Sequence, residues 1–85
     1  MKYLLITYVR KANEQIDEQM QVSNTLKDRD VQTCNVILNF ETNSIEKAVI
    51  NGNKVDTTWE QIVEYYSKIY PSIVGRLIEE NMPPQ

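Results

Sequence analysis

The chain has 85 residues, of which 41% are apolar and 25% are charged, and its formal net charge is −3. This length allows a single domain, and the ordinary composition excludes the collagen-like, coiled-coil and disordered classes. No apolar run approaches the roughly 18 residues of a membrane-spanning helix. The lone cysteine, Cys34, cannot form an internal disulfide, which favours a reducing, cytoplasmic location.

The N-terminal segment is predicted to form a β-hairpin. Residues 2–10 are rich in Leu, Ile, Val and Tyr, and strand alternation places Tyr8 on one face and Tyr3 on the other. A polar stretch that can turn separates them from residues 16–22, which again alternate between apolar and polar side chains. Because Glu, Gln and Met are good helix formers, a helix over residues 14–21 is the competing interpretation. The alternation favours the strand.

A short helix is predicted to follow this hairpin. Thr25 and Asp28 have the spacing of a capping box, in which side chains satisfy the first backbone N–H groups of a helix. The helix would span residues 26–34 and would be peripheral, since few of its apolar side chains share a face. Cys34 is expected to be a small buried hydrophobic residue, with a reactive thiol as the alternative.

A second hairpin is predicted from two further alternating segments. Residues 35–41 and 45–50 are separated by three polar residues typical of a tight turn. The pair Asn51-Gly52 tolerates positive φ at both positions, so another chain reversal is expected there. Lys54 and Val55 would form a short continuation of the strand.

From residue 56 the apolar residues recur at helical spacing. Thr57 and Glu60 form a second candidate capping box, which predicts a helix from about residue 58 to about residue 80. Pro71 lacks a backbone N–H, so the helix is expected to kink or break near Tyr70 and to restart with the proline as its first residue.

These elements predict an α+β fold. It would be a small two-layer sandwich with an antiparallel sheet of about four strands (two hairpins), a short helix between the hairpins and a long, proline-interrupted C-terminal helix packed on one face. Residues 1–81 would form this single domain, and residues 82–85 a frayed tail. The expected core consists of Leu4, Ile6, Val36, Leu38, Val49, Trp59, Ile62, Tyr66, Ile69, Ile73 and Leu77.

The residue types that the chain lacks restrict its chemistry. It has no histidine, which removes the usual general base at neutral pH, and its single cysteine cannot supply a zinc site. Its two glycines form no phosphate-binding motif. Paired carboxylates remain open, but Asp17 and Glu18 are neighbours on a strand and point to opposite faces. We therefore expect a protein that is not an enzyme and needs no metal or cofactor.

The aromatic residues of the C-terminal helix favour protein binding. Tyr65 and Tyr66 are separated by about 100° around a helix, so both cannot face the same core. The apolar arc is wider than one sheet face requires, and its surplus is either enclosed by neighbouring segments or free to bind a partner. The expected binding residues are Tyr65, Tyr70 and Trp59, together with an acidic patch of Glu14, Asp17 and Glu18. Self-association is a further expectation.

Single-stranded nucleic-acid binding on the sheet is the alternative function. Basic and aromatic residues alternate around the first strand, where Tyr3, Tyr8, Arg10 and Lys11 could stack on bases and contact phosphates. The negative net charge and the absence of the basic-glycine-aromatic pattern of RNA-binding sheets disfavour this reading.

Three segments carry a resemblance to a known group of proteins. They are the opening MKYLLITYVR, the string TCNVIL at residues 33–38 and the string YYSKIYPSI at residues 65–73. With these segments the chain resembles small uncharacterised proteins encoded by tailed phages, including marine ones, over nearly its whole length. The resemblance implies a role in binding a host protein and inhibiting or redirecting it. None of the three segments is a catalytic or ligand motif, so no residue role follows from it.

Overall fold

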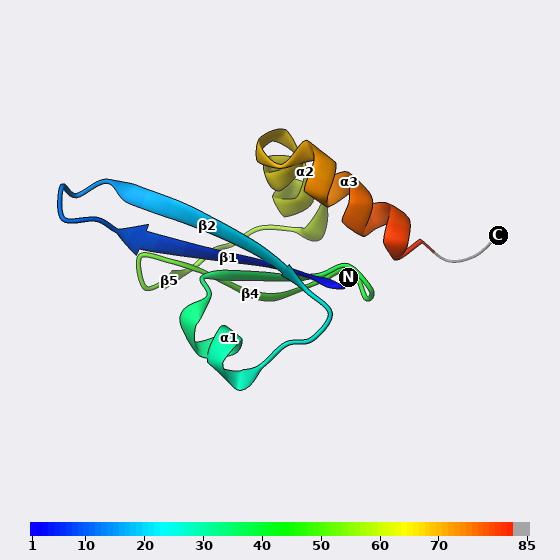
Figure 1. Ribbon diagram of the computed structural model, residues 1–85, viewed down its shortest axis with the longest axis horizontal. Coiled ribbons are helices and arrows are strands. Elements are labelled where there is room, and N and C mark those ends of the chain that lie inside the picture. Colours follow the sequence, from blue (N-terminus) through cyan, green and yellow to red (C-terminus); the bar gives the residue numbers. More distant parts are fainter. Residues whose placement is uncertain (83–85) are drawn as a thin grey trace.

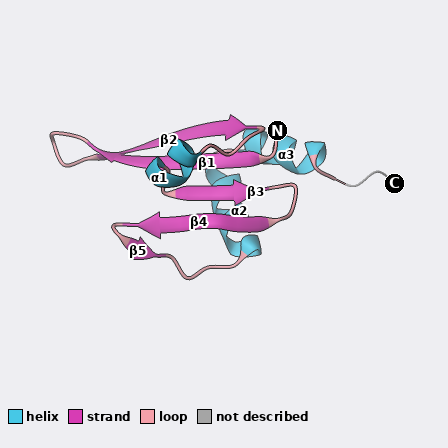
Figure 2. Ribbon diagram, turned by 90° about the horizontal axis from the view of Figure 1, so that it is seen from below, coloured by secondary structure: helices cyan, strands magenta, loops and turns pink. Residues whose placement is uncertain are grey.

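The computed structural model describes residues 1–82 and consists of an antiparallel sheet with helices on both faces (Figure 1). The strands are β1 (Tyr3–Arg10), β2 (Ile16–Ser23), β3 (Val36–Asn39), β4 (Ser44–Ile50) and β5 (Asn53–Lys54), in the order β2-β1-β3-β4-β5 (Figure 2). The helices are α1 (Asp28–Thr33), α2 (Trp59–Ile69) and α3 (Pro71–Glu80). The predicted α+β class is confirmed. The sheet has five strands instead of about four, because the chain pairs once more after β4.

The first hairpin has the predicted strands. β1 and β2 pair without interruption from Tyr3 opposite Ser23 to Arg10 opposite Ile16. The competing helix over residues 14–21 is not formed, because alternate residues of β2 pack against the core between the sheet and helices α2 and α3. In the turn, Glu14 adopts a φ of 66°, and the Lys11 N–H donates to the Gln15 carbonyl at 2.8 Å.

The predicted reversal at Asn51-Gly52 joins β4 to β5. Both residues have positive φ, 55° at Asn51 and 76° at Gly52, as a two-residue hairpin turn between twisted strands requires. The β3–β4 pairing is less regular, since its register shifts between Ile37 and Leu38.

The sheet is buried on both faces, which corrects the expectation of one covered face. On one side α2 and α3 cover the main core of Leu4, Ile6, Val36, Leu38, Phe40, Ala48, Ile62, Tyr66, Val74 and Leu77. On the other side α1 covers a second core of Leu5, Cys34 and Ile37, with Tyr3 and Leu26 at its border (Figure 1). The central strand β3 is therefore buried throughout, as its continuous apolar run Val-Ile-Leu permits. Cys34 is buried, as predicted.

Both helix starts lie further along the chain than the capping-box spacings predict. At α1 the cap is Lys27, whose N–H donates to the Asp30 carboxylate at 3.3 Å. At α2 the cap is Thr58: its hydroxyl accepts from the Gln61 N–H at 3.2 Å, and its own N–H donates to the Gln61 side chain at 3.4 Å. The sequence Thr-Thr-Trp-Glu-Gln satisfies the motif in two registers, and only the second is used.

Pro71 breaks the C-terminal helix where predicted. Tyr70, between the two helices, leaves the helical conformation with φ −127° and ψ 62°, as a residue before proline is disposed to do. The break changes which side chains face the sheet. Ile69 is 42% exposed and the prediction that it is core is wrong, whereas Tyr70 packs against the main core.

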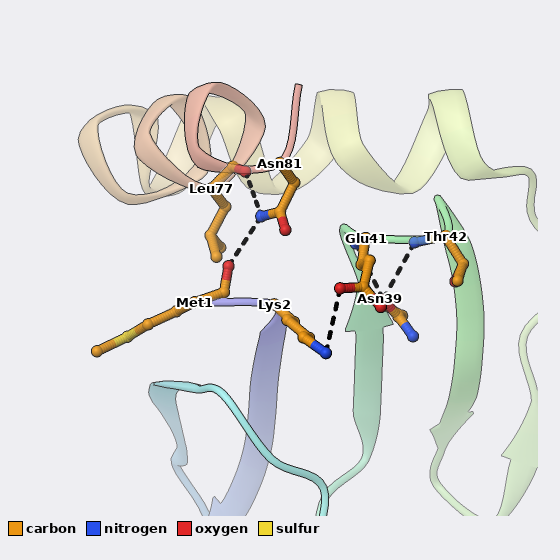
Figure 3. Close-up of polar contacts among 7 residues, drawn as sticks. All are labelled: Met1, Lys2, Asn39, Glu41, Thr42, Leu77 and Asn81. Carbon is orange, nitrogen blue, oxygen red and sulfur yellow. Dashed lines mark hydrogen bonds and ion pairs between the residues drawn. The ribbon is translucent and has the colours of Figure 1, made fainter. Parts of the chain in front are cut away.

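Polar contacts join α3 and the β3–β4 turn to the start of the chain (Figure 3). The Asn81 side-chain amide donates to the Met1 carbonyl at 2.8 Å and to the Leu77 carbonyl at 2.7 Å. Beside them, Lys2 pairs with Glu41 at 3.1 Å. Of the tail predicted over residues 82–85, residues 83–85 lie outside the described residues. Within residues 1–82, no helix is long and apolar enough to cross a membrane.

Candidate functional site

The face of the sheet that α2 and α3 cover is open at one end. The β1–β2 hairpin and the β4–β5 turn extend past the helices there, so part of this face has no helix above it (Figure 1). Two adjoining hollows of about 340 Å³ and 430 Å³ occupy this end, and their walls share Tyr8, Ile50 and Tyr65. We call their union the groove. Its other lining residues are Val36, Ala48, Val55, Thr57, Gln61, Ile62 and Tyr66 beside α2, and Arg10, Ile16, Asn35, Asn51 and Gly52 toward the hairpin.

Asn35 builds the floor of the groove. It lies just before β3, the strand between β1 and β4, so at this point β1 and β4 have no strand residue between them. Its side-chain oxygen accepts from the Tyr8 N–H at 2.9 Å, and its side-chain amide donates to the Val49 carbonyl at 3.1 Å. The side chain thus replaces one backbone rung of the ladder and pairs the Tyr8 N–H and the Val49 carbonyl.

Four polar side chains tie the helices to the sheet at the inner end of the groove. Tyr8 and Tyr66 share a hydroxyl–hydroxyl hydrogen bond of 2.9 Å. The Tyr70 hydroxyl donates to Glu18 at 2.5 Å, and Glu18 is the cross-strand partner of Tyr8. β1, β2, α2 and the α2–α3 junction therefore meet through two polar contacts on top of apolar packing.

These contacts keep the phenols protonated. Burial raises the pKa of Tyr8, and its hydrogen bond with Tyr66 and the negative charge of Glu18 act in the same direction. Burial also raises the pKa of Tyr66. The pKa of Tyr70 is raised to about 12, and the hydrogen bond to Glu18 makes the largest contribution to this increase. Near neutral pH these three tyrosines therefore serve as hydrogen-bonding structural groups and not as bases.

The rim of the groove carries exposed apolar side chains. Tyr65 is 54% exposed, and its ring stands edge-on against the buried Tyr66 with centroids 5.0 Å apart. Ile50 on β4 and Ile16 on β2 are 38% and 58% exposed. Among the residues that line the described groove, Arg10 is the one with a formal charge.

The predicted protein-binding residues do not lie together. Tyr65 lies on the groove, but Tyr70 is held inward by Glu18. Trp59 packs edge-on against Phe40, with ring centroids 5.0 Å apart, and borders the main core. The acidic patch is divided as well. Glu14 lies in the hairpin turn, and Asp17, the cross-strand partner of Val9, points to the opposite face of β2 from Glu18.

The residues of the nucleic-acid alternative are likewise divided. Tyr3 borders the second core beneath α1, whereas Tyr8 lies on the opposite face with its hydroxyl bonded to Tyr66. Arg10 lines the groove and Lys11 lies in the turn. A single-stranded nucleic acid on one face of the sheet cannot stack on both tyrosines. The sequence did not identify Ile16 and Ile50 as groove residues. The one feature that could have indicated them is the position of a large apolar side chain beside a turn, at the end of a strand.

The groove has the chemistry of a binding surface. Within residues 1–82, no group of three His, Cys, Asp or Glu side chains is placed to hold a metal ion. Asp17 and Glu18, the acid pair considered above, lie on opposite faces of β2. What the groove does offer is apolar contact area, one guanidinium, and amides at Asn51 and Gln61.

Compared with protein-family models, with curated proteins and with solved structures, the chain matches none of them. The function is therefore inferred from the groove itself.

Proposed function

We propose that this protein is a non-catalytic protein-binding module and that its groove takes a short segment of a partner protein. The observation that carries the proposal is the exposed apolar rim of Tyr65, Ile50 and Ile16 above the floor that Asn35 ties together by hydrogen bonds. Tyrosine is enriched among the residues that dominate binding energy, because a large ring contributes contact area at a small cost in side-chain entropy. Hollows of 340 Å³ and 430 Å³ are large enough for one or two side chains of such a segment.

The lining also indicates the chemistry of the segment. A bulky apolar side chain fits between Tyr65 and Ile50, where apolar atoms form both walls. Toward the hairpin, Arg10 supplies a guanidinium whose planar fork suits a carboxylate. The proposed segment therefore pairs a large apolar residue with an acidic residue or a C-terminal carboxylate. The rest of its contacts would exclude water without adding much affinity.

The resemblance to small phage proteins suggests where such a segment comes from. If the chain is phage-encoded, the partner is a host protein of the cytoplasm, which the module would inhibit or redirect by occupying one of its segments. The lone buried thiol of Cys34 suits a reducing compartment.

Selection from a random-peptide library against the immobilised protein tests the proposal. We expect enriched peptides that combine a bulky apolar residue with an acidic one. Replacing Tyr65 by Ala should weaken their binding about 30-fold or more, as expected for a residue that carries about 2 kcal/mol. Replacing Arg10 by Gln should remove the preference for the acidic residue. The matched control is Val31→Ala, which shortens an exposed apolar side chain on α1 and should leave binding unchanged.

Two results would contradict the proposal. One is a library without enrichment, and the other is an enriched peptide whose affinity is the same for Tyr65→Ala as for the native protein. Titration with a single-stranded oligonucleotide separates the alternative function, which predicts saturable binding that weakens steeply as salt is added.

A further inference from the structure

The outer edge of β2 is unpaired. β2 is the last strand of the sheet in the order β2-β1-β3-β4-β5, and none of the described residues pairs with its outer side. It is eight residues long, whereas the opposite edge strand, β5, has two. An edge strand of this length presents a row of free backbone groups that can pair with another chain.

The hydrogen bonds of β1 show which residues supply those free groups. On its β3 side, β1 bonds through even-numbered residues: the Lys2 and Ile6 carbonyls accept there, and the Tyr8 N–H donates to Asn35. This leaves its odd-numbered residues to bond on the β2 side. The bonds at the two ends both reach odd-numbered residues of the partner segment: the Lys11 N–H donates to the Gln15 carbonyl, and the Lys2 N–H, just before β1, donates to the Ser23 carbonyl. Antiparallel partners bond in matched pairs, so the odd residues of β2 face β1. The N–H and C=O groups of Ile16, Glu18, Met20 and Val22 therefore point outward.

Natural edge strands usually carry features that block such pairing. Proline, lysine, a bulge or an irregular twist would serve, and β2 has none of the first three: its sequence is Ile-Asp-Glu-Gln-Met-Gln-Val-Ser and its pairing with β1 has no register shift. Its two acids, Asp17 and Glu18, lie near one end. This uneven charge distribution restricts which partner strand and which register can pair.

We propose that the β2 edge binds a second copy of this chain, antiparallel, with Gln19 opposite Gln19 of the second copy. This register is the one closest to the hairpin turn in which no acid lies directly opposite another acid. Glu18 then stands opposite Met20, Asp17 opposite Gln21 and the exposed Ile16 opposite Val22. Slipping by two residues toward the turn would place Glu18 opposite Glu18, and like charges directly opposite each other are unfavourable. A parallel arrangement would align both acids with their copies.

The same register satisfies the backbone. Residues Ile16, Glu18, Met20 and Val22 pair only with one another, so every outward N–H and C=O group of this row finds a partner. Ile69, the last residue of α2, is 42% exposed. The next residue, Tyr70, joins this end of the helix to β2 through its hydrogen bond to Glu18. The dimer would form one continuous sheet with both helical layers on the same side. It shares Ile16 with the rim of the groove, but it leaves Tyr65 and Ile50 free.

Charge changes at a single exposed position test this pairing. Gln21 lies on the α1 side of β2, and the proposed register places it opposite Asp17 of the second copy. By sedimentation equilibrium we expect a mass that rises with concentration from 10.0 kDa toward twice that value. Gln21→Lys should tighten the dimer by about fivefold and Gln21→Glu should weaken it by about fivefold, since each change occurs at two symmetric contacts. Gln32→Lys, which makes the same charge change on α1, should leave the dissociation constant unchanged.

A disulfide cross-link tests the register independently of charge. Gln19 would form a non-hydrogen-bonded pair with its copy, with Cα atoms about 4.5 Å apart, within the range of a disulfide. Gln19→Cys should therefore form a covalent dimer under mild oxidation, while Gln21→Cys and the native protein, whose Cys34 is buried, should not. A mass of one chain at every concentration would overturn the proposal, as would equal cross-linking at both positions or equal responses to Gln21→Lys and Gln32→Lys. Peptide binding in the groove would survive each of these failures.

Discussion

Replacing Ile37 by Ala tests whether α1 and the second core contribute to stability. Ile37 and Leu38 are neighbours on β3, both with 0% exposure, and they face the two different cores. Ile37→Ala removes about three buried carbon atoms, which corresponds to about 2.4 kcal/mol at about 0.8 kcal/mol for each. The cavity left behind adds to this value when the surroundings cannot close it. We therefore expect the free energy of unfolding to fall by about 2–4 kcal/mol.

Urea unfolding followed by circular dichroism and by Trp59 fluorescence provides the measurement. Leu38→Ala should cost about 2–5 kcal/mol, because its core is larger and held by two helices. Ile69→Ala is the exposed control and should cost less than about 1 kcal/mol. A loss at Ile37 as small as that at Ile69 would show that the α1 face of the sheet is not a core, and the description of a sheet buried on both faces would then be wrong.

Three further predictions concern polar contacts and turns. Asn35→Ala should lower the free energy of unfolding by about 1–3 kcal/mol, because it leaves one donor of β1 and one acceptor of β4 without partners; amide exchange at Tyr8 should accelerate with it. Tyr70 has a pKa of about 12 in the folded protein against 10.0 for a free tyrosine, so its contribution to stability is complete below pH 10.0 and is lost as the pH rises to about 12. Alkaline unfolding curves should show this loss, and Tyr70→Phe should remove that part of the pH dependence. Gly52→Ala should cost about 1–2 kcal/mol in urea unfolding, since φ there is +76° and a Cβ would crowd the adjacent backbone carbonyl, although it would meet no atom of a more distant residue.

The sequence predicted the strands and helices well wherever one pattern dominated. Residues 16–22 alternate so that Met20 and Val22 share the helix side, and this pattern outweighs the helix propensity of Glu and Gln. Asn51-Gly52 and Pro71 have few conformational options, which is why the turn and the helix break occur where expected. These are local constraints, and local sequence contains them.

What depends on long-range packing was predicted less well. The capping motif at α2 fits in two registers that the local sequence does not distinguish, and the structure uses Thr58. Ile69 follows the helical stripe but faces solvent, because the break at Pro71 turns Tyr70 toward Glu18 instead. The burial of Ile37 depends on α1 crossing beneath the sheet, which its few apolar residues did not indicate.

The candidate site shows the same division. Helix geometry alone predicts that one of Tyr65 and Tyr66 must leave the core, and Tyr65 does. The groove beside it required strand order, since Arg10 and Ile16 belong to the first hairpin whereas Ile50 comes from β4, which is distant from it in sequence. Tyr70 and Trp59 look like surface anchors in the sequence because nothing local reveals their partners, Glu18 and Phe40.

The most direct test of the proposed function is to map the bound segment by NMR. A peptide selected as described above, added to isotopically labelled protein, should shift the amide signals around Tyr65, Ile50 and Arg10, with the largest changes along the groove. Signals of α1 should remain in place. Shifts centred on α1 or on the outer edge of β2, with the groove unaffected, would contradict the assignment of the groove as the binding site.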